Sequence, residues 1–287
     1  MIDPEAVTRA SRVDLVTNFR SYTPTGISKM RELERDSSPD TPPRARLAIV
    51  GRGRVGTALA DALSRAGYEV SGPLGRCADG LRADGLAADA VLLCVPDAEI
   101  APAAAQVALG PLVGHCSGAT SHRELTPHEA FSLHPLMTVT TEGADFAGAG
   151  AAIAGTTPRA LAFAAELAAA LAMLAVEVAE PDRAAYHAAA SIASNFLVTL
   201  EAAAERVGAA AGMEREQLVP LVRATVENWA RLGPGRALTG PVARGDEATI
   251  ERQRAAVQEV APDLVSLFDE LVSATRAIAA SREAQPA

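Results

Sequence analysis

Aromatic residues and excess positive charge are both scarce in this sequence. Phe, Trp and Tyr make up only 3% of the chain, so we expect cores built mainly from Ala, Leu and Val, which suits close-packed helices. The formal net charge of -9 leaves no broad basic surface to attract the phosphates of DNA or RNA. We therefore expect no nucleic-acid partner.

Cysteine and long apolar runs are also scarce. The 287 residues include three cysteines, an odd number without the spacing of metal ligands. The histidines and acids do not cluster at ligand spacing either, so we expect no metal site. No uncharged apolar run of about 18 residues occurs, and the N-terminus lacks the layout of a signal peptide. The sequence therefore predicts a soluble, cytoplasmic protein with no membrane partner.

Three segments differ in composition. Residues 1–44 mix charges with Ser, Thr and Pro, which cannot bury enough apolar surface, so we predict a disordered tail. Residues 45–180 alternate short apolar runs with helical patterns, which is typical of a doubly wound α/β sheet. Residues 181–287 hold long segments rich in Ala and Leu, which are typical of helices. The expected strands are 47–50, 68–70, 90–95, 112–115 and 151–154, and the expected helices are 55–66, 102–108, 182–210, 214–231 and 246–283.

A glycine-rich motif follows the first expected strand and opens the first expected helix. In such a motif, Gly51 permits a tight turn, Gly53 lets the backbone approach a pyrophosphate, and Gly56 allows the helix to pack closely on the strand. The alternative is a glycine turn that serves packing alone. The expected cofactor-binding residues of this loop are Gly51, Arg52, Gly53, Arg54, Val55 and Gly56. The motif therefore predicts an N-terminal Rossmann domain, followed by an all-α C-terminal domain.

The end of the second expected strand indicates which dinucleotide binds. An acid there would accept both ribose hydroxyls of NAD and repel a 2′-phosphate. Residues 71–76 contain no acid, whereas Arg76 can present a fork of donors to a phosphate and Arg52 can approach from the glycine loop. The alternative for Arg76 is an ordinary solvated arginine. We predict NADP(H) as the cofactor.

Two further loops follow the carboxyl ends of expected strands. Val95, Pro96 and Asp97 lie in one loop, and Ser117 and Gly118 lie in the other. Because ligands bind at this edge of an open α/β sheet, we expect both loops to line the cofactor, and Ser117 also to contact the substrate. Pro96 and Asp97 would equally suit a turn and a helix cap.

One histidine is the first candidate for proton chemistry. His134 precedes a proline in an apolar stretch, so it is expected in an extended segment, where its imidazole could protonate a carbonyl oxygen or orient a carboxylate. A hydrogen-bonded structural histidine is the alternative. His115 ends an apolar strand and is a weaker candidate, while His122 and His128 lie in a polar loop where exposure is expected.

Polar residues in the C-terminal segment supply further candidates. His187, Ser191 and Asn195 repeat every four residues, which suggests a cleft wall in which His187 donates a proton and Asn195 orients the substrate. Small polar residues that merely allow close packing are the alternative. Arg244 follows a Gly-Pro loop and could clamp a substrate carboxylate or form an ion pair between subunits, and Asp246 is expected to cap the next helix.

Four other segments accompany the glycine loop: 93–97, 115–119, 132–137 and 239–246. Together they resemble bacterial Rossmann-like oxidoreductases with a C-terminal domain of unknown function, which look like relatives of pyrroline-5-carboxylate reductase, ketopantoate reductase and the β-hydroxyacid dehydrogenases. The resemblance implies a nicotinamide cofactor, an interdomain cleft, frequently a dimer, and a helical domain of the 6-phosphogluconate dehydrogenase-like type. β-Hydroxyacid dehydrogenases carry a catalytic lysine where this chain has Ser191, and this departure puts their usual chemistry in doubt.

The leading hypothesis is hydride transfer between NADPH and the carbonyl or imine carbon of a small, carboxylate-bearing metabolite. The alternative is an NADP-binding sensor or interaction protein that has lost turnover, because Ser191 replaces the lysine. The apolar faces of the C-terminal helices exceed what one layer of three helices buries, so we predict a homodimer through this half. These faces include Leu218, Val219, Leu221, Val222, Leu264, Val265, Leu267 and Phe268.

Overall fold

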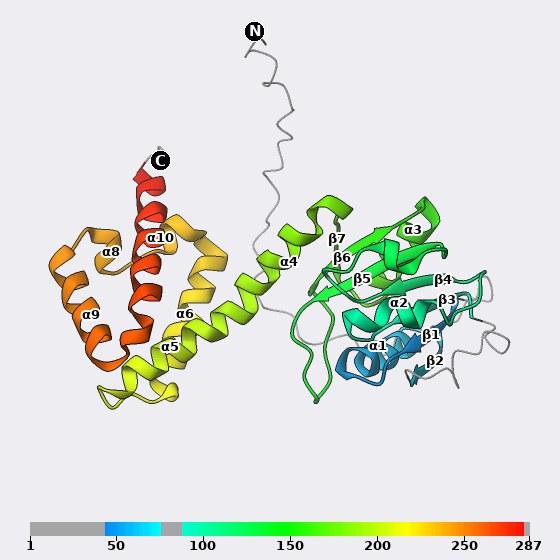
Figure 1. Ribbon diagram of the computed structural model, residues 1–287, viewed down its shortest axis with the longest axis horizontal. Helices are drawn as coiled ribbons and strands as arrows, with labels where there is room; N and C mark the ends of the chain where they lie inside the picture. The colour runs from blue at the N-terminus through cyan, green and yellow to red at the C-terminus, as the bar shows by residue number, and fades with distance from the viewer. Residues whose placement is uncertain (1–43, 76–87, 284–287) are drawn as a thin grey trace, which may run out of the picture. The chain divides into compact units, whose positions relative to one another are not determined.

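The computed structural model describes residues 44–75 and 88–283. They form a seven-stranded sheet covered by helices and, after it along the chain, a set of further helices (Figure 1). The predicted tail lies outside the described residues except for Arg44, and so does Arg76.

All the predicted strands occur in one mixed sheet, in the order β2-β1-β3-β4-β5-β6-β7. Their bounds are β1 Arg46–Val50, β2 Glu69–Leu74, β3 Ala90–Leu93, β4 Leu112–His115, β5 Ala130–Leu136, β6 Gly150–Gly155 and β7 Leu174–Glu177. Strands β1 to β5 run parallel, β6 is antiparallel to β5, and β7 is parallel to β6. The carboxyl ends of five strands therefore share one edge, where ligands bind in sheets of this kind.

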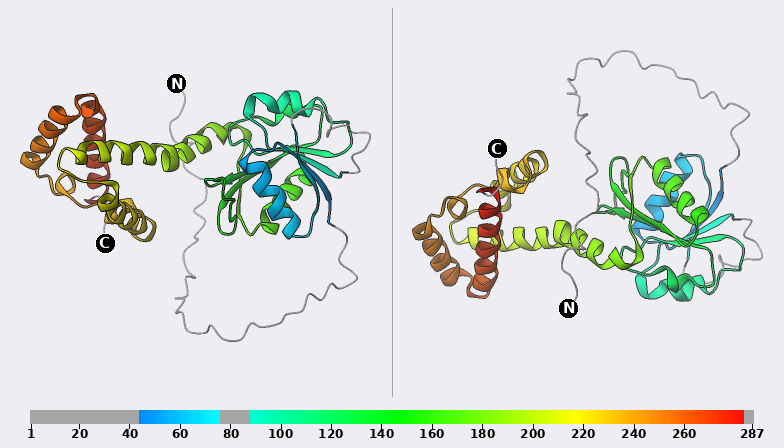
Figure 2. Two further views of the ribbon diagram at one scale, coloured as in Figure 1. Left: turned by 90° about the horizontal axis from the view of Figure 1, so that it is seen from below. Right: turned by 90° about the horizontal axis from the view of Figure 1, so that it is seen from above.

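Helices cover both faces of the sheet. Their bounds are α1 Arg54–Arg65, α2 Ile100–Ala104 and α3 Pro158–Ala170. Along β1, Leu47 and Ile49 join a buried cluster with α1 and α3, while Ala48 and Val50 join a second cluster with α2. Figure 2 shows α2 on one face of the sheet and α1 and α3 on the other. The prediction of a doubly wound α/β sheet is therefore confirmed.

The sequence pattern does not predict α3 or β7. Helix α3 begins with a cap, because the Thr157 hydroxyl accepts a hydrogen bond from the Ala160 N–H and Pro158 occupies the first turn. Its apolar residues, however, extend around most of the helix, so its period is weak. Strand β7 has four residues and lies at the edge of the sheet, which gives no alternating pattern of useful length.

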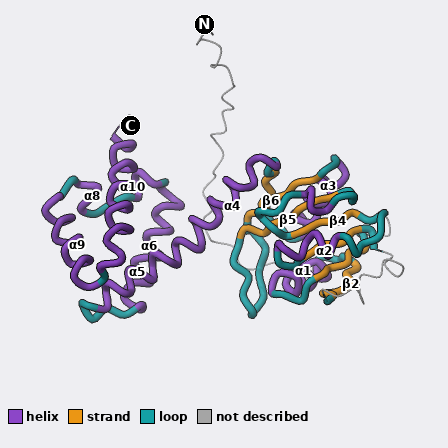
Figure 3. The backbone as a smooth tube through the Cα atoms, viewed as in Figure 1, coloured by secondary structure: helices purple, strands orange, loops and turns teal. Residues whose placement is uncertain are grey.

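After β7 the described residues form helices and loops, which Figure 3 distinguishes by colour. The bounds are α4 Arg183–Ser191, a π-helical turn Ile192–Phe196, α5 Leu197–Ala209, α6 Arg215–Leu232, α7 Pro234–Ala237, α8 Pro241–Arg244, α9 Glu247–Val260 and α10 Val265–Glu283. Three predicted helical segments are present, although a 3₁₀ turn at Pro262–Leu264 divides the last of them. Asp246 caps α9 as predicted, since its Oδ1 accepts the Thr249 N–H at 3.1 Å. Across the described ranges, the helices are too short or too polar to cross a membrane.

Candidate functional site

The three glycines after β1 each have the geometry that a dinucleotide loop requires. Gly51 has φ +113°, and a Cβ on it would lie 2.1 Å from the carbonyl oxygen of Cys94. A Cβ on Gly56 would lie 2.0 Å from the carbonyl oxygen of Gly51, so α1 approaches the loop as closely as backbone permits. A Cβ on Gly53 would meet nothing within 4 Å. Space therefore lies open at the one glycine that should face a pyrophosphate.

The N-terminus of α1 can accept an anion beside this open space. Gly53 is its N-cap, no side chain caps its first N–H groups, and no acid lies in its first turn. The unpaired N–H groups and the helix dipole both favour a phosphate here. The loop residues therefore fit the pyrophosphate of a dinucleotide.

Arg52 lies near the carboxyl end of β2, where the adenosine ribose of a bound dinucleotide would lie. A Cβ built on Gly75 would be 3.9 Å from Arg52 Cζ, and residues 71–75 contain no acid. Arg54 is exposed in the first turn of α1, and Val55 packs partly against the sheet core. Arg76, the other predicted phosphate ligand, lies outside the described residues. Arg52 is thus the described guanidinium with the right placement for a 2′-phosphate.

The loop after β3 is placed as expected, but one detail of the prediction is wrong. Val95 is half-buried, and Pro96 and Asp97 are exposed at the carboxyl edge of the sheet. A 3₁₀ turn begins at Asp97 itself, with Pro96 as its N-cap and no capping side chain. Asp97 therefore does not cap α2, because the chain enters the turn one residue earlier than a cap would require. Burial has the largest effect on His134 and lowers its pKa; the Asp97 carboxylate opposes this effect but does not outweigh it.

The turn after β4 is organised around the buried residues Ser117 and Gly118. The Ser117 hydroxyl accepts hydrogen bonds from the N–H groups of Ala119 at 3.2 Å and Thr120 at 2.9 Å, and its own N–H donates to His115 Nδ1 at 3.2 Å. These bonds give Ser117 a clear structural role in the turn. His115 is fully buried, and burial lowers its pKa to about 3.

His134 lies on β5, as the extended prediction requires, and contacts an unpredicted partner. Its Nδ1 lies 2.7 Å from the hydroxyl of Tyr186 on α4, and the two rings meet edge to face with centroids 5.6 Å apart. Burial, followed by the neighbouring charge of His187, lowers the pKa of His134 to about 4. The imidazole is therefore neutral near neutral pH.

Gly118 brings the two candidate histidines together. A Cβ on Gly118 would lie 2.9 Å from both His134 Cε1 and His187 Nδ1, and the two imidazole centroids are 6.2 Å apart. A cavity of about 490 Å³ opens beside them. It is lined by His134, Pro135, Leu136, Met137, Thr138, His187, Ala190, Ser191, Ala193, Ser194 and Asn195. Four predicted site residues, His134, His187, Ser191 and Asn195, thus share one cavity.

The helix that carries three of these residues contains a feature that periodicity alone does not predict. An α-helix ends at Ser191, and a π-helical turn follows over Ile192–Phe196. Such turns are frequent at functional sites. Asn195 lies in the π turn and still reaches the cavity wall with Ser191 and His187.

A buried polar network lies two residues along β5 from His134. Arg183 at the start of α4 is only 6% exposed; its Nη2 donates to Ser132 Oγ at 2.6 Å and to His122 Nε2 at 3.0 Å. Its Nε donates to Glu180 at 3.0 Å. Burial, and then the charge of Arg183, lowers the pKa of His122 to about 4. The expectation that His122 is exposed in a polar loop is therefore wrong, because Arg183 comes from a helix 61 residues away.

Arg244 is not brought to the cavity. It is exposed at the end of α8, and it is absent from the residues that line the cavity beside His134. Its charge lowers the pKa of nearby Asp246, after larger effects from Thr249. Nothing in the described residues places its guanidinium against His134 or Asn195.

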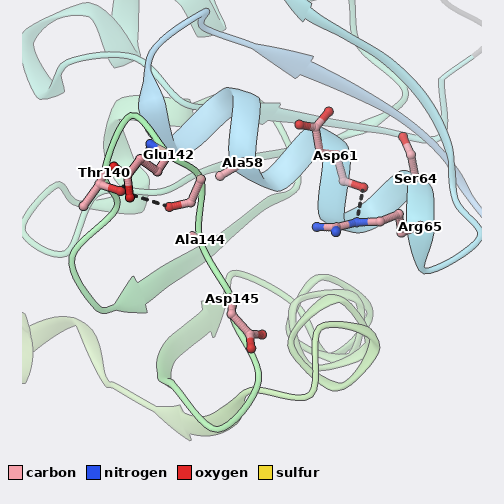
Figure 4. A pocket seen from close by; sticks show the side chains of 9 residues that line it. Ala58, Asp61, Ser64, Arg65, Thr140, Glu142, Ala144 and Asp145 are labelled. Carbon is pink, nitrogen blue, oxygen red and sulfur yellow. Dashed lines mark hydrogen bonds between the residues drawn. The ribbon is translucent and has the colours of Figure 1, made fainter.

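A larger hollow, of about 860 Å³, lies away from the histidines (Figure 4). It lies between α1 and the loop after β5, and Asp61, Glu142 and Asp145 are its acidic lining residues. Figure 4 shows that these carboxylates do not converge, and Arg65 Nε donates to the backbone of Asp61 within the same hollow. Within the described ranges, no three His, Cys, Asp or Glu side chains lie close enough to hold a metal ion. We therefore place the candidate site at the smaller cavity, which is lined by residues of β5, α4 and the π-helical turn.

Comparisons with known proteins agree with the fold. Residues 149–275 match the family model described as Domain of unknown function (DUF2520), which begins at the last two strands and continues through the helices. No curated protein matches the sequence.

Three solved structures share the arrangement of the chain. A candidate NADP oxidoreductase, BF3122 from Bacteroides fragilis, is 21% identical, with TM-score 0.67, over 81% of this chain and 98% of its own. Protein TM1727 from Thermotoga maritima is 24% identical, with TM-score 0.67, over 83% and 99%. A reductive aminase from Aspergillus terreus, solved with NADPH and ethyl levulinate, is 15% identical, with TM-score 0.60, over 82% and 97%. At these identities the likeness shows that this chain shares the fold of these three proteins.

Proposed function

We propose that this protein is an NADP(H)-dependent oxidoreductase that acts on the carbonyl or imine carbon of a small, carboxylate-bearing metabolite. The glycine loop carries the proposal, because Gly53 is open where Gly51 and Gly56 are tightly packed. That pattern suits a pyrophosphate and has no evident use in packing alone. The similar structures named for NADP or solved with NADPH support the same cofactor.

The residues assigned to the cofactor occupy the carboxyl edge of the sheet. Arg52, with Arg76, would bind the 2′-phosphate, while the first turn of α1 would hold the pyrophosphate. Val95, Pro96, Asp97 and the Ser117–Gly118 turn would support the nicotinamide side. When bound, NADPH supplies a hydride.

The proton side of the reaction falls to the two histidines. With a pKa of about 4, His134 is neutral and acts by donating an N–H hydrogen bond to the substrate oxygen or nitrogen. His187 lies across Gly118 and is the second candidate donor. Ser191 and Asn195 would orient the substrate from the helix wall of the same cavity. Ser117 and Arg244 are the remaining substrate candidates, and Arg244 would need to reach the anionic end from a different surface.

A homodimer through the helices completes the proposal. Large apolar side chains on α6 are exposed, including Leu221 at 65% and Trp229 at 58%. Exposure of this extent on one helix is typical of an interface. Size-exclusion chromatography with light scattering should give twice the chain mass of 29.5 kDa, and a single species at the chain mass would contradict the dimer.

A second function is favoured by Ser191. An NADP-binding sensor without turnover would keep the glycine loop. It would need no proton donor at Ser191, the position where β-hydroxyacid dehydrogenases carry a lysine. Calorimetric titration with NADPH and NADH, followed by NADPH oxidation assays with ketopantoate, pyrroline-5-carboxylate and other 2-oxo acids or imines, separates the two. Binding with turnover supports the reductase, binding without turnover the sensor, and no binding contradicts both.

A further inference from the structure

Tyr186 is a polar residue that the proposed function does not use, although it touches a residue that the function depends on. It lies on α4, is half-buried, and its hydroxyl is 2.7 Å from His134 Nδ1. We infer that Tyr186 is a positioning residue that fixes the tautomer of His134, so that the ring proton is carried by Nε2. The inference rests on the proposed function, because that proton is the one offered to a carbonyl or imine.

Proton counting across the pair determines the direction of the hydrogen bond. Burial raises the pKa of the Tyr186 phenol, so the phenol keeps its proton, and His134 has only one ring proton. In the described residues His134 Nδ1 is the hydroxyl's one recorded acceptor. In the inferred arrangement the half-buried O–H donates to Nδ1, which is then the unprotonated ring nitrogen.

The other tautomer is the costlier arrangement. A proton on Nδ1 would point at the Tyr186 oxygen, and the phenol proton would then have to turn away from the hydroxyl's one side-chain partner in the described residues. It would also leave Nε2 as a lone pair, which repels a substrate oxygen. In the described residues, the buried side-chain nitrogens and oxygens without a partner belong to His115 and His128. The His134 ring instead lines the cavity, where its Nε2 is accessible. The proton therefore lies on the nitrogen that a ligand can reach.

A second contact fixes the distance between the helix and the strand. Arg183 and Tyr186 are three residues apart on one face of α4, and Ser132 and His134 are two residues apart on one face of β5. Two adjacent hydrogen bonds thus join these elements: Arg183 to Ser132 at 2.6 Å and Tyr186 to His134 at 2.7 Å. Two hydrogen bonds resist rotation of α4 against β5, so the phenol is held within hydrogen-bond distance of Nδ1.

The test reads the tautomer directly. Nitrogen-15 NMR of the histidine rings, with His134 assigned by its loss in His134→Gln, should show a protonated Nε2 and a bare Nδ1 in the wild type at neutral pH. Tyr186→Phe removes one oxygen and should shift His134 towards a mixture of tautomers. Tyr68→Phe is the matched control, because Tyr68 is a buried phenol that donates to Glu166 on the other face of the sheet. It should leave the His134 signals unchanged.

Activity provides a second readout once a substrate is known. Tyr186→Phe should lower kcat by about tenfold or more with little change in KM, since the loss falls on proton positioning. A wild-type His134 protonated at Nδ1, or a tautomer unchanged in Tyr186→Phe, overturns the inference. The wild-type spectrum decides even if the variant does not fold. Because the spectrum needs no turnover, a protein that binds NADPH without reducing anything would sink the proposed reductase function and leave the assignment of the His134 tautomer to Tyr186 standing.

Discussion

The sheet region and the helical region of this chain bury their apolar residues to very different extents. From β1 to β7, two clusters fill both faces of the sheet, and side chains such as Leu133 and Phe131 are fully buried. Among the described residues after α4, the buried apolar side chains are few: Ile250, Val257, Ala261 and Val265. The sheet region is thus closed by its own helices, whereas the helical region presents apolar surface that a monomer leaves in water.

This difference indicates where each part of the function is determined. The cofactor loop needs a rigid framework, and it lies on the region that is packed on its own. The helical region has an apolar groove of about 410 Å³, formed by α5, α9 and α10. An exposed groove and exposed residues on α6 are what a second copy would cover in the proposed homodimer.

The largest expected effect comes from the same substitution made in each region. Leu133→Ala removes a fully buried side chain and should lower the free energy of unfolding by about 3 kcal/mol. Leu221→Ala removes a side chain that is 65% exposed in the monomer, so at low protein concentration the loss should stay under about 1 kcal/mol. Urea unfolding measures both, and at high concentration the Leu221 variant should lose more, because dimerisation is weakened. Equal losses at every concentration would erase the contrast between the regions.

A smaller effect is the dependence of stability on pH. It should come from the part of the chain before α5, since all five histidines lie there. Folding lowers the pKa of His115 from 6.5 to about 3, mainly by burial. The unfolded chain therefore takes up a proton that the folded chain refuses, and stability is lost as the pH falls below 6.5. Between pH of about 6.5 and about 5 the loss should be about 1.5 kcal/mol for this histidine.

Urea midpoints across this range give the slope. His115→Asn, which keeps an acceptor for the Ser117 N–H, should flatten it, while Ser64→Val, at an exposed position on α1, is the control. A slope that is the same in His115→Asn as in the wild type would mean that the buried histidine does not couple to folding.

The smallest effect separates cofactor binding from the helical region. Arg52→Ala should weaken NADPH about tenfold and leave NADH nearly unchanged, since a charge-assisted bond to the 2′-phosphate is lost. Arg244→Ala is the matched control from α8 and should change neither affinity. Calorimetric titrations of both variants with both nucleotides give the comparison. An equal loss for NADH and NADPH would remove Arg52 from the phosphate site.

The sequence predicts the parts of the site that depend on local chain geometry. The glycine loop is recognisable because strand β1, a tight turn and helix α1 follow one another within 20 residues. An extended segment is predicted at His134, because Pro135 restricts the residue before it, and His134 lies on β5. Helical spacing predicts one shared face for His187, Ser191 and Asn195, and these residues line one cavity.

Contacts between distant segments could not be predicted in the same way. The Tyr186–His134 bond joins residues 52 positions apart, and the burial of His122 depends on Arg183, 61 positions away. The π turn after Ser191 likewise has no signature in a run of small residues. These features arise when α4 packs on β5, so periodicity within one element cannot indicate them.

Gly53 provides the most direct test of the central claim. It has φ -76°, and a Cβ there would meet nothing within 4 Å, so Gly53→Val should fold as the wild type does. Ser64→Val, at an exposed position on the same helix, is the control. In calorimetric titrations, NADPH should bind the wild type and Ser64→Val and lose at least about 100-fold in affinity for Gly53→Val, because the new side chain fills the pyrophosphate position. Equal NADPH affinity in all three proteins, or none in the wild type, would contradict the account.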